Sequence, residues 1–216
     1  MKRNGLKITG PSKKLNGYPQ FDAKEIRLSF TKNPCLLNQY FYIAKEVYKN
    51  DLGLDGKFGD QDEFDELPNT RILLVRHKGE CVGGLRLVFH EKHSDGLLPL
   101  EHPDFKLSEY FPMICKSGHT YAEVSRFVLK PDYRNSKLVK SLFLSVKEEV
   151  DNWQCNYLFS ASPKRQSRVF RRLVQSMGHQ FSTMKQIPIP ERKEYGGLQL
   201  FLSVTGPILR RMVMAC

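Results

Sequence analysis

The sequence lacks the marks of several protein classes. Its cysteines include no Cys-x-x-Cys pair, which argues against a structural zinc site or a disulfide framework and favours a reducing cytoplasm. No apolar run approaches the roughly 20 residues that a membrane helix needs. The basic start has no apolar segment behind it, so we expect no secretory signal. The scattered cysteines are Cys35, Cys81, Cys115, Cys155 and Cys216.

Catalytic signatures of two further classes are also missing. The six histidines show neither a His-Glu-x-x-His pattern nor another paired-ligand spacing, so we expect no metal site. No serine lies in a Gly-x-Ser-x-Gly elbow, which argues against the usual serine hydrolases.

Positive charge is in excess, and it predicts an acidic partner. The chain has 34 Lys and Arg against 23 Asp and Glu, for a net charge of +11. Nucleic acid, an anionic lipid surface, a phosphorylated cofactor or an acidic protein all fit this charge. A solvated helix face is the simpler interpretation of the densest basic cluster, which comprises Lys164, Arg165, Arg168, Arg171 and Arg172.

The length and the pattern of the chain indicate one α/β domain over residues 24–207. We expect residues 1–23 to form a flexible arm. Residues 208–216 form an apolar, basic tail that packs on the domain, pairs with another subunit or touches a membrane surface. Periodicity and turn signals predict strands at 25–31, 71–76, 81–89, 119–130, 156–161, 180–187 and 197–204, and helices at 33–49, near 107–110, at 137–153 and at 165–177.

The strand at 119–130 is the most informative of these elements. It should be largely buried, yet Glu123 and Arg126 lie on it three residues apart. Charges on a core strand are costly unless they are paired or take part in chemistry. A polar turn at 132–136 and a helix follow, and a helix N-terminus favours phosphate. We therefore place the candidate site here.

Three segments, in this order, resemble one family. Asp60–Asp65 is similar to an acidic Asp-x-Phe/Tyr-Asp segment, Val82–Leu87 to a Val-Gly-x-x-Arg-Leu strand, and Ala122–Phe127 to a Glu-x-Ser/Gly-Arg-Phe/Leu strand. Together they resemble the GNAT N-acyltransferases, in the branch of the acyl-homoserine-lactone synthases and N-acyl amino acid synthases. The resemblance implies three layers: a twisted, mixed and mostly antiparallel sheet with a V-shaped split, flanked by helices.

Two departures from that branch bear on the substrates. Residues 42–54 lack the Trp and the in-phase Arg of the lactone synthases, which favours an amino acid or similar small amine over S-adenosylmethionine as acceptor. The loop 134–139 lacks the glycines of acetyl-CoA enzymes. The resemblance thus implies acyl transfer from the phosphopantetheine thioester of acidic acyl carrier protein, with acyl-CoA as the alternative donor.

The resemblance and the chemistry of amide formation assign roles to the charged residues. Glu123 is expected to orient the amine and remove its proton, unless it only pairs with Arg86 or Arg126. Asp62 and Asp65 hold the acceptor ammonium or act as base, unless they only cap their loop. Arg86 and Arg126 bind a carboxylate, either that of the acceptor or those of the acidic loop.

Donor-binding residues are expected around the end of the same strand. Arg134 and Lys137 are candidates for the pantetheine phosphate, with a solvated turn as the alternative, and Leu138 belongs to the same loop. Candidates for an acyl tunnel, with ordinary core as the alternative, are Phe127, Val128, Phe143 and Phe159. Two other functions compete with catalysis: a non-catalytic basic GNAT scaffold, and nucleic-acid binding, for which no recognition motif is visible.

Overall fold

The computed structural model describes residues 25–54, 59–90, 96–116, 118–187, 189–190 and 197–206. The expected arm at 1–23 and tail at 208–216 lie outside these ranges. The strands are β1 Ile26–Phe30, β2 Thr70–His77, β3 Glu80–Phe89, β4 Tyr121–Leu129, β5 Tyr157–Pro163, β6 Gln180–Thr183 and β7 Leu200–Gly206. The helices are α1 Pro34–Leu52, α2 Leu107–Tyr110, α3 Pro112–Cys115, α4 Ser136–Asn152 and α5 Lys164–Ser176, with 3-10 turns η2 Glu63–Asp65 and η3 Pro131–Tyr133.

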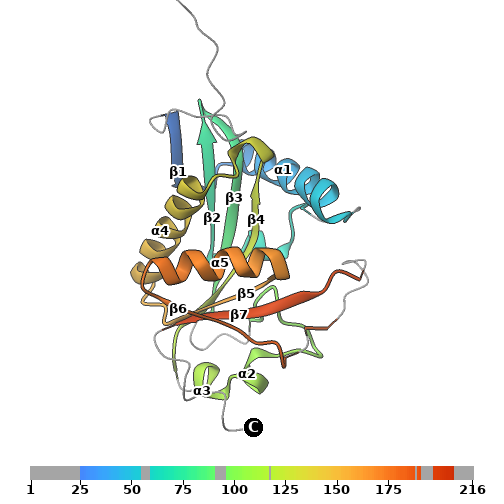
Figure 1. Cartoon of the computed structure of the whole chain (residues 1–216), viewed down its shortest axis with the longest axis vertical. Coiled ribbons are helices and arrows are strands. Elements are labelled where there is room, and N and C mark those ends of the chain that lie inside the picture. The colour runs from blue at the N-terminus through green and yellow to red at the C-terminus, as the bar shows by residue number, and fades with distance from the viewer. Residues whose placement is uncertain are drawn as a thin grey trace, which may run out of the picture.

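These strands form one sheet in the order β1-β2-β3-β4-β5-β7-β6 (Figure 1). Strands β4 and β5 are parallel, and all the other neighbouring pairs are antiparallel. The predicted mixed, mostly antiparallel sheet is therefore confirmed. Three boundaries differ from the sequence prediction by three residues or more: α1 ends at Leu52 rather than 49, β6 ends at Thr183 rather than 187, and β7 begins at Leu200 rather than 197. Helix α3 was not predicted.

Local signals explain where the two long helices begin. The Asn33 side chain accepts a hydrogen bond from the backbone N–H of Leu36, and Pro34 follows at the first helical position of α1. The Asn135 side chain accepts in the same way from the N–H of Leu138 at the start of α4. Asparagine and proline at these positions are typical helix starts, because they satisfy or remove otherwise unpaired N–H groups.

The β2–β3 hairpin also follows from its sequence. Lys78 and Gly79 both have positive φ, 53° and 92°, as a tight two-residue turn requires. Gly83 and Gly84 are needed for close approach, because a Cβ at Gly83 would overlap the Val128 carbonyl oxygen. A Cβ at Gly84 would likewise overlap the Leu73 carbonyl oxygen, so β3 lies close to both neighbouring strands here.

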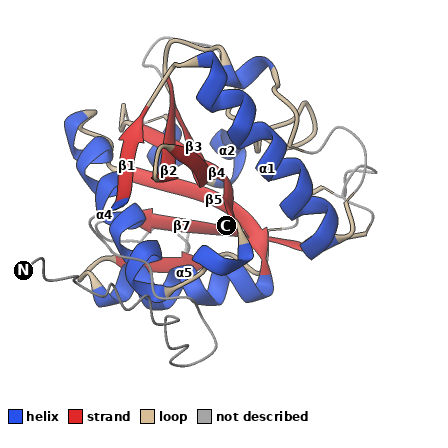
Figure 2. Ribbon diagram, turned by 90° about the horizontal axis from the view of Figure 1, so that it is seen from above, coloured by secondary structure: helices blue, strands red, loops and turns tan. Residues whose placement is uncertain are grey.

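Helices cover the two faces of the sheet, which gives the three expected layers. Along β2, Leu73 and Val75 face the cluster that includes α4 and α5, whereas Ile72 and Leu74 face α1. Figure 2 shows the sheet between α1 on one side and α4 and α5 on the other. A further apolar cluster packs α2, α3 and their preceding loop on the β5–β7 half.

The sheet splits between β4 and β5. The two strands pair only from Tyr121 to Glu123 on β4 and from Tyr157 to Phe159 on β5. Beyond Glu123, β4 continues along β3 and β5 continues along β7, so the strands diverge. A cavity of about 590 Å³ lies in this split, with Glu123 at its wall. The predicted V-shaped split thus positions the candidate site.

Candidate active site

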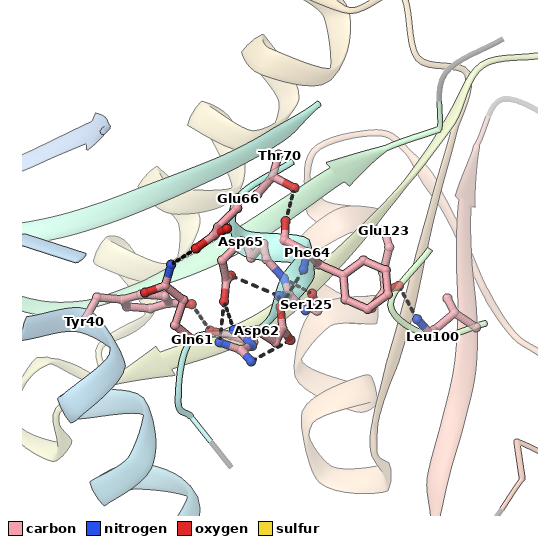
Figure 3. A network of polar contacts seen from close by, with 12 residues as sticks. Tyr40, Gln61, Asp62, Phe64, Asp65, Glu66, Thr70, Leu100, Glu123 and Ser125 are labelled. Carbon is pink, nitrogen blue, oxygen red and sulfur yellow. Dashed lines mark hydrogen bonds and ion pairs between the residues drawn. The ribbon is translucent and has the colours of Figure 1, made fainter. Parts of the chain in front are cut away.

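A cluster of two guanidinium groups and two carboxylates lies beside the cavity (Figure 3). Arg86 Nη1 lies 2.6 Å from Asp62 Oδ1 and 3.0 Å from Asp65 Oδ1. Arg126 Nη2 lies 2.7 Å from Asp62 Oδ2, and its Nη1 lies 3.1 Å from Asp65 Oδ2. Both arginines therefore bind the acidic loop, which is one of the two roles that the sequence left open.

The acidic loop holds its own shape through a capping box at η2. Asp62 Oδ1 accepts from the N–H of Phe64, and Asp65 Oδ2 accepts from the N–H of Asp62. The Asp65 side chain is only 1% exposed, whereas that of Asp62 is 36% exposed and borders the cavity. Of the two aspartates, Asp62 is thus the one whose carboxylate is accessible from the cavity.

Burial and ion pairing act against each other in this cluster. Burial lowers the pKa of Arg86, but the carboxylates of Asp65 and Asp62 outweigh it and raise that pKa above its usual value. Burial raises the pKa of the Asp65 carboxyl, and the two guanidinium groups oppose that shift. Arg86 therefore stays charged, because its carboxylate partners outweigh the cost of burial.

Glu123 occupies the point where β4 and β5 separate. It is 3% exposed and lines the cavity, and its Oε2 accepts a hydrogen bond of 2.6 Å from the N–H of Leu100. Glu101 fixes the turn that carries Leu100, because its two carboxylate oxygens accept from the N–H groups of Leu98 and Leu107. A carboxylate buried at a cavity wall and held by a backbone amide is placed to receive a proton.

The backbone of β4 bulges beside Glu123. Gly84 pairs with Val128 but Arg86 pairs with Ser125, so two residues of β4 oppose one of β3. Arg126 has a φ of 54°, which is uncommon for a residue with a side chain. The fully buried Tyr40 donates a hydrogen bond of 2.7 Å to the Arg126 carbonyl. Sequence analysis missed this contact, since a tyrosine on an apolar helix face was its only signal.

The predicted donor-binding residues divide between the cavity and the core. Phe127 and Phe143 line the cavity, whereas Phe159 is fully buried in the cluster with α2 and α3. Val128, on the opposite side of the strand, is 1% exposed in the cluster beneath α1. Leu138 is 8% exposed in the cluster of α4 and α5. We therefore withdraw Val128 and Leu138 from the donor site, because strand alternation and the helical face direct both into the core.

The two predicted phosphate ligands also differ. The Arg134 guanidinium donates to the Leu129 carbonyl and pairs with Asp51 at 2.7 Å, which links the end of β4 to α1. Lys137 is exposed in the first turn of α4. Lys137 is therefore the better placed of the two for an incoming phosphate.

The cavity is mixed in character. Its wall includes the carboxylates of Asp62 and Glu123 and the rings of Phe127, Phe143 and Phe170. A second cavity of about 280 Å³ lies between α4 and α5. The two cavities share Val124, Phe143, Ser160 and Phe170 as wall residues. Carboxylate and phenyl side chains therefore line spaces that adjoin each other.

Two features are absent from the described part of the chain. Among these residues, no group of three or more His, Cys, Asp or Glu side chains is arranged to hold a metal ion. No described helix is long and apolar enough to cross a membrane.

Residues 39–188 match the model of the family described as N-acyl amino acid synthase FeeM, and this match covers more than half of the chain. The chain belongs to the FeeM family. It is accordingly an acyltransferase of the group that joins acyl chains to amines, as the three sequence motifs predicted. No curated protein sequence matches it significantly.

Solved structures share the fold of this FeeM-family chain at low sequence identity. FeeM itself, an N-acyl amino acid synthase from uncultured soil microbes, is 16% identical with a TM-score of 0.59, over 83% of this chain and 89% of that one. The CoA-dependent acyl-homoserine lactone synthase BjaI is 17% identical, with a TM-score of 0.53 over 84% and 80% of the two chains. An acetyltransferase from Streptococcus agalactiae 2603 is 13% identical, with a TM-score of 0.56 over 85% and 99%. These likenesses support the predicted GNAT fold.

Proposed function

We propose that this FeeM-family enzyme transfers a fatty acyl chain from an acyl carrier protein or CoA thioester to the amine of an amino acid or similar small acceptor. One observation carries the proposal: a single cavity joins the buried carboxylate of Glu123 to a wall of phenyl rings. An amine, which must lose a proton, fits the first end. A hydrocarbon chain fits the second, because its burial there removes apolar surface from water.

The acceptor amine is proposed to bind between Asp62 and Glu123. Its nitrogen attacks the thioester carbonyl, so a carbon–nitrogen bond forms and the carbon–sulfur bond breaks. The Glu123 carboxylate takes the amine proton, directly or through one water molecule, and the leaving thiolate is protonated in turn. N–H groups at the β4 bulge beside Arg126 are candidates to donate hydrogen bonds to the developing oxyanion.

The acyl chain is proposed to pass Phe143 and Phe170 into the smaller cavity. These two rings belong to both cavity walls, and their centroids lie 5.2 Å apart. Phe127 packs edge-on against Phe170 and closes the same wall. The three rings therefore form a junction whose size limits the chain that enters.

The carrier protein is proposed to dock on α5. The first turn of this helix borders the cavity through Gln166, so a thioester arm that enters here reaches Glu123 through the split. A surface rich in exposed cations attracts an acidic carrier and increases its association rate. The exposed cations of the α5 surface are Lys164, Arg165, Arg168, Arg171 and Arg172.

The described cysteines support the expected cytoplasmic location. Cys35, Cys81, Cys115 and Cys155 are free thiols in the structure. Free thiols are the usual state of cysteine in a reducing compartment, and we accordingly propose that the enzyme works in the cytoplasm.

The decisive test is product analysis with purified enzyme. Acyl carrier protein and CoA thioesters are each incubated with amino acids, and mass spectrometry identifies N-acyl products. Glu123→Gln should lower kcat by about 10² to 10⁴ and leave the melting temperature nearly unchanged, because the amide oxygen still accepts from the N–H of Leu100. Glu149→Gln is the control, since this carboxylate pairs with Arg71 and Trp153 and does not line the cavity, so the change should lower stability rather than kcat.

Each result of that test has a definite meaning. An N-acyl amino acid supports the proposal and names the acceptor. An acyl-homoserine lactone, formed only with S-adenosylmethionine, would replace the proposed acceptor. No acylated amine from either donor class would contradict the proposed function, and full activity in Glu123→Gln would remove the proposed base.

The carrier surface is tested by charge reversal. Arg168→Glu with Arg172→Glu should raise KM for the acyl carrier protein thioester and leave KM for acyl-CoA unchanged. The matched control, Lys106→Glu with Lys116→Glu, changes net charge equally at exposed positions beside α2 and α3. Equal KM values for all three proteins would contradict docking on α5.

A further inference from the structure

One hydroxyl group in the cavity wall has no described partner. Ser162 on β5 is 3% exposed and lines the large cavity. Among the residues that the structure describes, none accepts or donates a hydrogen bond to its Oγ. Buried hydroxyl groups in folded proteins are nearly always paired, so one that is not requires a reason.

Neighbouring hydroxyl groups on the same sheet are paired, which makes Ser162 an exception. Ser203 on β7 is 0% exposed, and its Oγ lies 3.2 Å from the Oγ of Ser167 on α5. Thr183 on β6 lies 3.2 Å from the same Ser167 oxygen. The packing between the sheet and α5 therefore satisfies hydroxyl groups where the cavity does not intervene.

The location of Ser162 indicates which ligand group it meets. Beyond Phe159, β5 no longer pairs with β4, and Ser162 lies on this diverging segment. Pro163 follows as the cap residue of α5, the helix that carries the proposed carrier surface. A donor arm running from α5 to Glu123 must pass this segment. The acceptor, by contrast, is proposed to bind between Asp62 and Glu123.

We propose that Ser162 Oγ forms a hydrogen bond with an amide group of the pantetheine arm of the acyl donor. The inference rests on the proposed function and identifies a donor-binding residue for it. A pantetheine arm carries amide groups that need polar partners when they leave water. Serine χ1 has three staggered positions, so rotation of one bond turns the hydroxyl group toward the cavity.

The test compares two buried serines, one unpaired and one paired. Pantetheine is the probe, its binding is measured by calorimetry, and melting temperatures are measured without ligand. Ser162→Ala should weaken pantetheine binding by roughly fivefold to tenfold, while its melting temperature stays equal or rises because no internal hydrogen bond is lost. Ser203→Ala should show the reverse: unchanged pantetheine binding and a lower melting temperature.

The outcomes separate this inference from the proposed function. Unchanged pantetheine binding in Ser162→Ala would overturn the inference, even if the enzyme makes N-acyl amines. If both binding and stability fall, Ser162→Thr decides: regained binding supports the hydroxyl contact, and persistent loss overturns it. A wild-type enzyme that makes no N-acyl amine from any thioester contradicts the proposed function instead.

Discussion

Asp62 and Asp65 should respond very differently to the same substitution. Asp65→Asn removes a carboxylate whose side chain is 1% exposed and leaves Arg86, which is 2% exposed, with one anionic partner fewer. Removing one partner of a buried ion pair costs about 3–5 kcal/mol. At roughly 2–4 °C per kcal/mol for a domain of this size, the melting temperature should fall by about 6–20 °C.

Asp62→Asn should mainly affect catalysis. The Asp62 side chain is 36% exposed, so water screens the lost charge, and the expected cost is about 1 kcal/mol or less. Because Asp62 borders the cavity, kcat/KM for the amine should fall while the melting temperature changes by at most about 4 °C.

Thermal unfolding followed by circular dichroism, with an acyl-transfer assay on the same samples, distinguishes the two variants. The double variant Asp65→Asn with Arg126→Gln should lose less stability than the sum of the single changes, by about 0.5–3 kcal/mol, since the two side chains contact each other. An Asp65→Asn protein that melts within about 2 °C of wild type would refute the reasoning. It would mean that Asp65 is already protonated in the folded protein, where burial raises its pKa.

Three further predictions follow from single contacts. Tyr40→Phe removes the donor to the Arg126 carbonyl and should lower kcat about tenfold with little change in KM. A rise in KM as large as the fall in kcat would contradict a role of Tyr40 in positioning the bulge. Iodoacetamide at pH 8 should label exposed Cys35 but not Cys155, because burial raises the pKa of Cys155 to about 12; peptide mapping that finds Cys155 modified in the folded protein would contradict its burial. Phe143→Ala should shift donor preference toward longer acyl chains in competition assays, and an unchanged preference would exclude the ring as the limit on chain length.

Local chemistry allowed most elements of the fold to be predicted. Asn33 and Asn135 begin helices because their side chains satisfy adjacent N–H groups, and Lys78-Gly79 forms a tight turn because glycine permits positive φ. The predicted end of β6 was wrong, because the sheet register along β7 decides where that strand stops. Gly83 and Gly84 require their residue type for a reason outside local sequence, because a Cβ at either would overlap a carbonyl oxygen of a neighbouring strand.

The sequence by itself determined which charged residues gather at the site, since its motifs carry Asp62, Asp65, Arg86, Glu123 and Arg126 in the family order. Only the tertiary structure decided which partners each one has and how far it is buried. Pairing, burial and access depend on residues far apart in the chain, and no local pattern records them. The acidic loop reaches both arginines, a distant turn donates to Glu123, and the pairing of β4 with β5 ends at that carboxylate.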